Sequence, residues 1–214
     1  MICIENRMNV WIGWYTPVRK CIVNFFAHRI QELFSWIMNS APAHEILPGL
    51  WLGNRGASQD TEFLREHQIT AIFNCTKDIP FRQGVHPDMH QYRVPLDDNL
   101  EPEEIRNLEH WGWEVAYKVA KERSAGNRIL VHCHAGMQRS AASLAIYLIA
   151  THRCTTEEAV AFIKQRRPIA FYGNVNFYKG IKGFENGFRR MISEKGAYAQ
   201  YPKLHLPTDQ ITGT

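Results

Sequence analysis

One short segment of the sequence combines a nucleophile, a fixed positive charge and a hydroxyl group. Cys133 is followed after five residues by Arg139, and Ser140 comes next. A short, mostly aliphatic run at 128–131 precedes the segment and predicts a buried strand. A longer run rich in Ala, at 141–150, follows it and predicts a buried helix. The nucleophile therefore stands at the start of a loop that joins a strand to a helix.

A loop of this kind is suited to binding a phosphate group. Backbone N–H groups at a helix N-terminus converge on one point and bind an oxyanion there. Gly136 lets the backbone approach closely or adopt a positive φ, and the planar guanidinium of Arg139 matches two phosphate oxygens. The same positive charge favours the thiolate form of Cys133, which is then placed for in-line displacement at phosphorus. We expect Ser140 to hydrogen-bond the sulfur and make it a better leaving group in a second step. A buried core cysteine is the alternative interpretation, but it does not account for the Arg and the Gly.

The segment 132–140 resembles the signature of the cysteine-dependent protein tyrosine phosphatase superfamily: His-Cys, five residues, Arg, then Ser or Thr. Four further segments resemble its dual-specificity, VH1-like branch, and they lie at 49–54, 68–76, 94–98 and 174–177. The resemblance covers about residues 44–190. It implies a protein phosphatase that hydrolyses phosphotyrosine, and also phosphoserine and phosphothreonine, through a phosphocysteine intermediate on Cys133.

The resemblance also implies a general acid on a mobile loop upstream of the signature. Such an acid is needed because an alkoxide or phenoxide is a poor leaving group. Aligning the apolar-Pro-apolar run 94–96 with the family places Asp98 at the acid position, while Asp97 is the alternative and could instead cap a turn. The same carboxylate would later take a proton from the attacking water. His132 is expected to position or tune Cys133, or to be a satisfied core histidine, and both roles can hold together.

The phosphate is expected to be held by six consecutive loop residues, His134, Ala135, Gly136, Met137, Gln138 and Arg139. None of the variable positions among them is Lys or Arg, whereas lipid-phosphate members of the superfamily tend to be basic there. This favours a phosphoprotein substrate over the alternative, a non-protein phosphate such as a phosphoinositide or an RNA 5′ end. Loss of Cys133 or Arg139 would have indicated a non-catalytic phosphate-binding module, but both are present.

No metal and no cofactor are expected. His132 and His134 flank Cys133, but alternation along an extended strand separates their directions from that of the cysteine. The sequence holds no second Cys/His pair with zinc spacing. The positive charge needed at the phosphate is available from Arg139 and from the backbone of the loop.

The composition is that of a globular protein. Of 214 residues, 45% are hydrophobic and 21% charged, and the formal net charge is +4. No block of Lys and Arg of the kind that marks a nucleic-acid-binding surface is present, so no nucleic-acid partner is expected. The five cysteines are odd in number and scattered. With no recognisable signal peptide, they favour a reducing compartment, with the cytoplasm as the default location.

The sequence predicts an α/β fold with a central, mostly parallel sheet flanked by helices. Strands are expected at 49–54, 70–75, 90–96 and 128–131; helices at 59–67, 102–123, 141–150, 155–167 and 175–192; and a loop at 79–89. A capping box at 155–158 opens one of these helices. Alternation of strands and helices indicates a parallel sheet, which places the 133–139 loop at the carboxyl end of a central strand, where such folds bind ligands.

Three parts of the chain are expected: an extension at 1–43, a dual-specificity phosphatase catalytic domain at 44–192 and a flexible tail at 193–214. Apolar residues recur at helical spacing through 17–39, which predicts an amphipathic helix. Charged residues interrupt it, so it is not a transmembrane span. Packing on the catalytic domain, a homodimer and peripheral contact with a membrane are the three uses left open for it.

Overall fold

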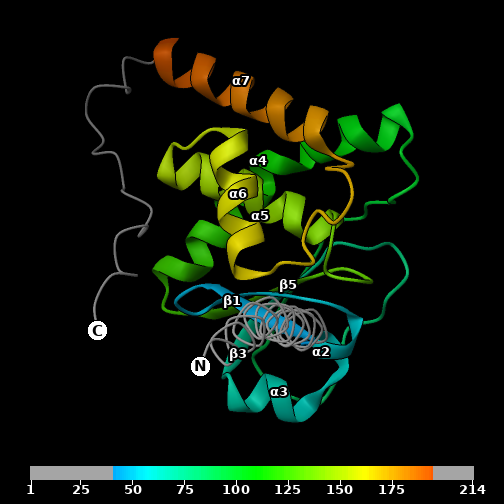
Figure 1. The fold of residues 1–214 in the computed structure, drawn as a ribbon. Coiled ribbons are helices and arrows are strands. Elements are labelled where there is room, and N and C mark those ends of the chain that lie inside the picture. The colour runs from blue at the N-terminus through cyan, green and yellow to red at the C-terminus, as the bar shows by residue number, and fades with distance from the viewer. Residues whose placement is uncertain (1–40, 195–214) are drawn as a thin grey trace, which may run out of the picture. The chain divides into compact units, whose positions relative to one another are not determined.

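The computed structural model describes residues 41–194, and its centre is a five-stranded sheet (Figure 1). The strands, in spatial order, are β1 (Ala43–Leu47), β2 (Leu50–Gly53), β5 (Arg128–His132), β3 (Ile69–Asn74) and β4 (His90–Arg93). Only the pair β1–β2 is antiparallel; β2–β5, β5–β3 and β3–β4 are all parallel. The predicted α/β class with a mostly parallel sheet is therefore confirmed.

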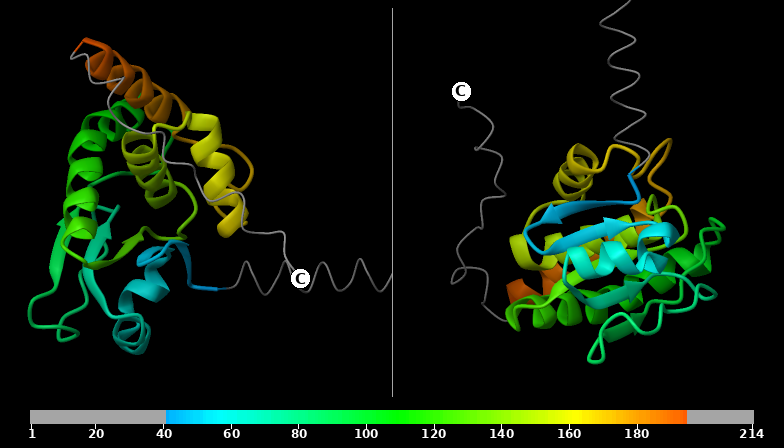
Figure 2. Two further views of the ribbon diagram at one scale, coloured as in Figure 1. Left: turned by 90° about the vertical axis from the view of Figure 1, so that its left-hand side faces the viewer. Right: turned by 90° about the horizontal axis from the view of Figure 1, so that it is seen from below.

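Helices cover both faces of this sheet (Figures 1 and 2). They are α2 (Arg55–Gln59), α3 (Thr61–Glu66), α4 (Pro102–Ser124), α5 (Arg139–His152), α6 (Thr156–Arg166) and α7 (Tyr178–Glu194). The short helices α2 and α3 lie on one face of the sheet, and the smaller of two hydrophobic clusters lies on the same face. The long helices lie on the other face, where α4 and α5 pack against β5, and α7 packs across α4 and α5.

The large core between the sheet and the long helices fixes the central strand and the helix that follows it. Ile129 and Val131 of β5 are buried on this side, and every residue of α5 from Ser140 to Ile149 is buried. A helix that is apolar on all sides is expected only in the middle of a core. The strand and the helix on either side of the 133–139 loop are thus both largely buried.

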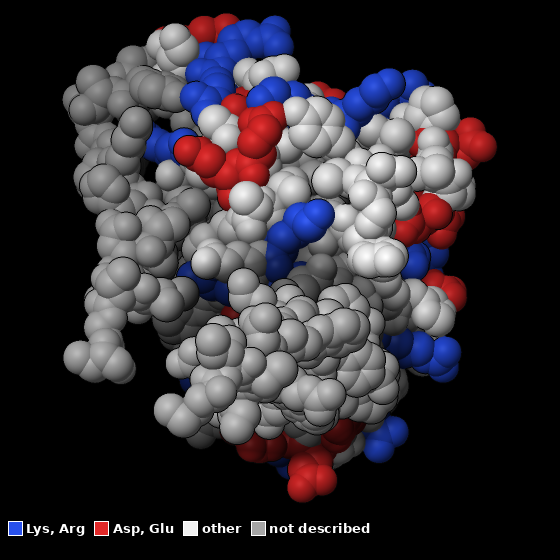
Figure 3. Space-filling model, viewed as in Figure 1, with Lys and Arg blue, Asp and Glu red and all other residues white. Residues whose placement is uncertain are grey.

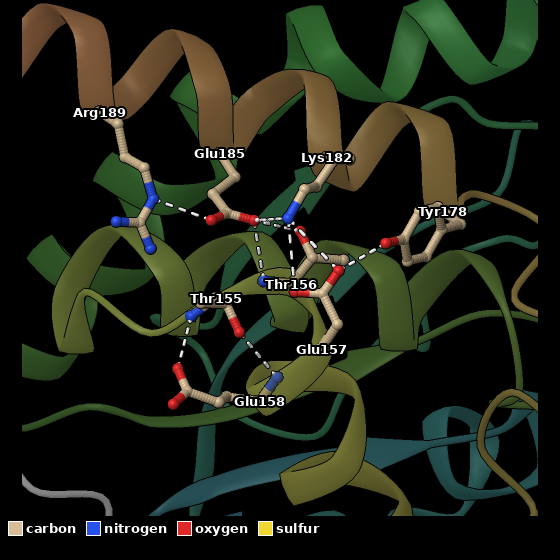
Figure 4. A network of polar contacts seen from close by, with 8 residues as sticks. All are labelled: Thr155, Thr156, Glu157, Glu158, Tyr178, Lys182, Glu185 and Arg189. Carbon is tan, nitrogen blue, oxygen red and sulfur yellow. Dashed lines mark hydrogen bonds and ion pairs between the residues drawn. The ribbon is translucent and has the colours of Figure 1, made fainter.

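Contacts at the start of α6 hold α7 in place (Figure 4). The predicted capping box is present: Thr155 Oγ1 accepts a hydrogen bond from the Glu158 N–H at 3.1 Å, and Glu158 Oε2 accepts one from the Thr155 N–H at 2.7 Å. Glu185 of α7 accepts hydrogen bonds from the N–H and hydroxyl of Thr156 at 2.9 and 2.8 Å. Figure 4 shows the remaining members of the network, Glu157, Tyr178, Lys182 and Arg189.

Two helices begin later than predicted, and one helix was not predicted. The helix predicted at 59–67 is α3, which begins at Thr61 after its N-cap Asp60, whose carboxylate accepts the N–H groups of Glu62 and Phe63. The helix α2, Arg55–Gln59, was not predicted. An N-cap residue has extended backbone, so it ends one helix as it starts the next. The last helix begins at Tyr178, three residues later than predicted.

The strand β1 was not predicted. It pairs with β2 as a hairpin around a turn at Pro48 and Gly49, where the Gly adopts φ +75°. Such a backbone conformation strongly favours glycine in a tight turn. The other predicted strands and helices are confirmed to within a few residues of their boundaries.

The amphipathic helix predicted at 17–39 lies outside the described residues, as does nearly all of the predicted tail. The three proposed uses of that helix therefore stay predictions. Within residues 41–194, no helix is both long enough and apolar enough to cross a bilayer. On the face of the molecule drawn in Figure 3, acidic and basic side chains are interspersed.

Candidate active site

The predicted nucleophile lies on a tight loop between β5 and α5. Cys133 directly follows the last residue of β5 and is 2% exposed. Ser140, in the first turn of α5, donates a hydrogen bond from its Oγ to Cys133 Sγ at 3.2 Å. Gly136 has φ +66°, and a Cβ there would lie only 2.5 Å from the carbonyl oxygen of Gly53. Only glycine fits this position, because both the conformation and the close approach of β2 exclude a side chain.

Arg139 brings a hydrogen-bond donor to this loop that the described residues leave unused. Its Nη1 donates to the carbonyl oxygen of Leu96 at 3.4 Å. Its Nε is buried and has no hydrogen-bond partner within the described part of the chain. Buried polar atoms are normally paired, so this N–H is available to an anion bound in the loop.

A cleft of about 390 Å³ opens above Cys133. It is lined by Asp98, Cys133, Ala135, Met137, Gln138, Arg139, Tyr172, Gly173, Asn174 and Asn176. The structure thus brings the predicted nucleophile, cation and acid to one place. A second cavity, of about 430 Å³, lies at the opposite, amino end of β3 and β5 and holds none of the predicted site residues.

The two acid candidates have different surroundings. Asp98 lines the cleft, and its Oδ1 accepts a hydrogen bond from Asn176 Nδ2 at 2.8 Å. Asp97 pairs instead with Lys77 at 2.6 Å and does not line the cleft. Lys77 also bonds Glu104 at 2.7 Å, and these two carboxylates raise the pKa of Lys77 to about 12. Asp98 is therefore the carboxylate that faces the cleft, whereas Asp97 is held in an ion pair outside the cleft lining.

His132 is held neutral beneath the loop. It is 1% exposed, and burial lowers its pKa to about 4, against a smaller opposing effect from a hydrogen bond with the Cys133 backbone. A neutral imidazole behind the nucleophile can orient the loop but brings no charge to it. His134 is exposed and does not line the cleft, although its carbonyl oxygen accepts a hydrogen bond from the Arg55 N–H at 3.0 Å.

The predicted phosphate-binding residues do not all face the cleft in the same way. Ala135, Met137, Gln138 and Arg139 line it, whereas Gly136 is buried beneath it. The side chain of Gln138 is engaged elsewhere. Its Nε2 donates to the carbonyl oxygen of Asn174 at 2.7 Å, and its Oε1 accepts from the Asn176 N–H at 3.1 Å. We infer that Ala135, Met137 and Gln138 offer a phosphate their backbone N–H groups and not their side chains, whereas Arg139 can also offer its guanidinium.

Sequence reasoning missed one residue that supports the loop from behind. Arg167, at the end of α6, is 1% exposed, and its Nε donates to the carbonyl oxygen of Gly136 at 2.9 Å. Its Nη1 lies 2.7 Å from His44 Nδ1, on β1. Burial lowers the pKa of Arg167 to about 10, and the nearby Cys133 opposes this shift, so the side chain remains a cation at neutral pH.

The Arg167 contact explains how the loop can bind an anion. By holding the carbonyl of Gly136 below the loop, the guanidinium keeps that oxygen away from an anion above it. Two local features, Arg167 itself and the Pro that follows it, mark a helix end in the sequence. Neither indicates burial, because the contacts come from residues 31 and 123 positions away.

No group of three or more His, Cys, Asp or Glu side chains within residues 41–194 is arranged to hold a metal ion.

Residues 50–187 match the family model described as dual specificity phosphatase, catalytic domain. The chain therefore belongs to the dual-specificity phosphatases, within the cysteine-dependent protein tyrosine phosphatase superfamily. This family identification agrees with the loop and cleft described above.

Individual relatives agree with this assignment. Dual specificity protein phosphatase 2 of Mus musculus is 36% identical over 126 residues, which are 58% of this chain and 37% of that protein. Dual specificity protein phosphatase 1 of Homo sapiens is 34% identical over 143 residues, 66% of this chain and 37% of that protein. The chain thus spans little more than a third of the length of these curated relatives. The crystal structure of human DUSP28 superposes with a TM-score of 0.61 at 26% identity, covering 70% of this chain and 96% of that one.

Proposed function

We propose that this chain is a cysteine-dependent protein phosphatase that hydrolyses phosphotyrosine and also phosphoserine and phosphothreonine. The observation that carries the proposal is the arrangement in the cleft. Cys133 lies at its base with the Ser140 hydroxyl on its sulfur, Arg139 has an unpaired Nε, and Asp98 lines the same cleft. These are the groups that a two-step phosphoryl transfer through cysteine needs.

In the first step, the Cys133 thiolate attacks phosphorus from the side opposite the leaving oxygen. The S–P bond forms as the P–O bond to the substrate breaks, and Asp98 transfers its proton to the departing oxygen. The Arg139 guanidinium and the backbone N–H groups of the loop bind the other phosphate oxygens and stabilise the charge that they carry in the transition state. The product is phosphocysteine and a free hydroxyl group on the substrate.

In the second step, water attacks the phosphorus of phosphocysteine. Asp98, now ionised, accepts a proton from that water, and the S–P bond breaks with its electron pair returning to sulfur. The hydrogen bond that Ser140 donates to the sulfur stabilises the thiolate as it leaves. Inorganic phosphate is released, and the cleft returns to its starting state.

A protein substrate is supported by two observations. The relatives that match the chain are named dual specificity protein phosphatases. The cleft has neutral residues, Ala135, Met137 and Gln138, beside Arg139, which gives a phosphoinositide headgroup with several phosphates no further cation on the loop.

The direct test is phosphate release by the full chain and by Cys133→Ser, with EDTA present, from a phosphotyrosine peptide, a phosphothreonine peptide and a phosphoinositide. Cys154→Ser is the matched control, because Cys154 is also buried but does not line the cleft. We expect release from the peptides by the wild type and the control, and none by Cys133→Ser. Release from the lipid alone, or full activity in Cys133→Ser, would contradict the proposal.

A further inference from the structure

The cleft has one exposed aromatic side chain at its rim. Tyr172 is 73% exposed and lines the cleft together with Cys133 and Asp98. The other large hydrophobic side chains that are exposed in residues 41–194 lie outside the cleft lining, and they are Leu100, Trp113, Tyr117 and Tyr178. The Tyr172 ring lies in the same cleft as Cys133 and has most of its surface exposed, so it is placed to contact a substrate that enters the cleft.

The backbone on both sides of Tyr172 is fixed to the phosphate-binding loop. Phe171 is fully buried, and its N–H donates to the carbonyl oxygen of Met137 at 2.9 Å. Two residues after Tyr172, the carbonyl oxygen of Asn174 accepts the Gln138 side chain at 2.7 Å. The ring is therefore presented from a turn that two hydrogen bonds hold against the loop beneath it.

This turn also has an uncommon backbone. Phe171 has φ +54° and Gly173 has φ +75°, so Tyr172 lies between two residues in the left-handed region. A bulky residue such as Phe rarely adopts a positive φ, and such a conformation persists only where the surrounding structure imposes it. Here the buried Phe171 ring and its hydrogen bond to Met137 impose it. The unusual conformation at this position marks the turn as a candidate functional element.

The wall around Tyr172 combines apolar and polar residues and leads to Cys133. Ala135 and the half-buried Met137 contribute to it, and Asp98 and Asn176 supply polar groups to the same cleft. A phosphorylated side chain bound with its phosphate on the loop must pass through this space. A phosphotyrosine ring would gain aromatic and sulfur contacts there, while the short phosphothreonine side chain would gain few.

We propose that Tyr172 is a specificity-determining residue whose ring contacts the aromatic ring of phosphotyrosine and favours it over phosphothreonine. This rests on the proposed phosphatase function, because it assumes that the phosphate binds above Cys133. The contact is made by the side chain of the substrate and not by its phosphate. It therefore discriminates between substrates without altering the groups that react.

The test uses two peptides that differ only in carrying phosphotyrosine or phosphothreonine. Their kcat/KM values are measured for the wild type, Tyr172→Ala and Tyr172→Phe. Tyr117→Ala is the matched control, since Tyr117 is 67% exposed on α4 and outside the cleft. We expect Tyr172→Ala to lower kcat/KM about three- to tenfold for the phosphotyrosine peptide and less than about twofold for the other. Tyr172→Phe and Tyr117→Ala should keep the wild-type ratio.

Binding gives a readout that does not depend on turnover. In the Cys133→Ser background, the dissociation constants of both peptides are compared with and without Tyr172→Ala, and inhibition by inorganic phosphate is measured in the active enzyme. Weaker binding of the phosphotyrosine peptide alone supports the proposal even if the wild type proves inactive. Where the wild type is active, its inhibition by phosphate should be unchanged by Tyr172→Ala. Equal effects on both peptides, no effect on either, or no binding of either peptide would overturn it.

Discussion

The base of the cleft and its rim are built in different ways. The base consists of the 133–140 segment and Arg167, and the side chains of Cys133, Ser140 and Arg167 in it are almost fully buried. The rim includes Asp98 and the segment 172–176, where Tyr172 is 73% exposed. The proposed nucleophile therefore lies where the surrounding contacts fix the backbone. The proposed acid, Asp98, and the proposed specificity residue, Tyr172, lie where side chains remain exposed.

The hydrogen bonds of the two regions also differ in burial, because that of Arg167 at the base is buried and that of Asp98 at the rim is exposed. At the base, Arg167 binds the Gly136 carbonyl in the interior, where an unpaired polar group is costly. At the rim, Asp98 and Asn176 form an exposed hydrogen bond, which contributes little net stability. Substitutions at the base should therefore affect folding as well as catalysis, and those at the rim should affect catalysis or specificity alone. Three predictions test this difference.

The largest expected effect is the dependence of stability on pH that His132 causes at the base. Its folded pKa of about 4 lies below the ordinary value of 6.5, so between these values the unfolded chain binds a proton and the folded chain does not. The free energy of unfolding should fall as the pH decreases from 6.5 to 4, by up to about 3 kcal/mol. Chemical denaturation across this range measures it.

His152→Gln is the matched control for His132→Gln, because burial lowers the pKa of both histidines. His132 is the more deeply buried of the two, so its replacement should remove the larger part of the acid slope. If His132→Gln fails to fold, the imidazole can be titrated by NMR in the wild type. A titration of His132 near its ordinary pKa would show that the base of the cleft does not hold it neutral.

The next effect concerns the two aspartates. Asp98→Asn should lower kcat for a phosphopeptide about a hundredfold, because the leaving oxygen then departs without a proton. It should have a smaller effect on p-nitrophenyl phosphate, whose leaving group needs no protonation. Asp97→Asn should leave kcat near that of the wild type, since it only weakens an ion pair that is about half exposed. Both variants should unfold at the same denaturant concentration as the wild type, because neither carboxylate is buried. The reverse ranking of kcat would exchange the roles of the two residues.

The smallest effect is that of Arg167→Met. The replacement leaves the Gly136 carbonyl without its buried partner, which should cost about 2 kcal/mol of unfolding free energy. Because the loop is then less well fixed, kcat/KM should also fall, by about tenfold. Denaturation and steady-state kinetics measure the two effects on the same sample. A loss of activity with no loss of stability would show that Arg167 acts otherwise than by holding the loop.

The arrangement of residues at the base could be predicted from sequence because these residues are neighbours in the chain. Cys133, Gly136, Arg139 and Ser140 lie within one strand-loop-helix unit, and the local pattern indicates both the loop and the phosphate chemistry. The flanking strand and helix could be predicted for the same reason, because burial on all sides gives a continuous apolar run.

The supporting contacts could not be predicted in this way. Arg167 has the local features of a helix end, and only the packing of α6 beside β1 and the loop buries it. The apolar residues of the short strand β1, Ala43, Ile46 and Leu47, do not alternate with polar ones, so no strand pattern marks it in the sequence; its pairing with β2 defines it. Asp60 did offer a signal, since an Asp followed by Thr and Glu is a plausible N-cap, and the start of α3 at Thr61 could have been found from it.

The most direct test of the account is to trap the phosphoryl group on Cys133. Ser140→Ala should slow the second step more than the first, because the hydrogen bond to the sulfur assists its departure. Rapid acid quenching of this variant with a phosphotyrosine peptide, followed by mass spectrometry of the digested chain, would locate the group. The account predicts one added phosphoryl group on the peptide that contains Cys133, and none in Cys133→Ser. A phosphoryl group on another residue, or turnover without any phosphorylated chain, would contradict it.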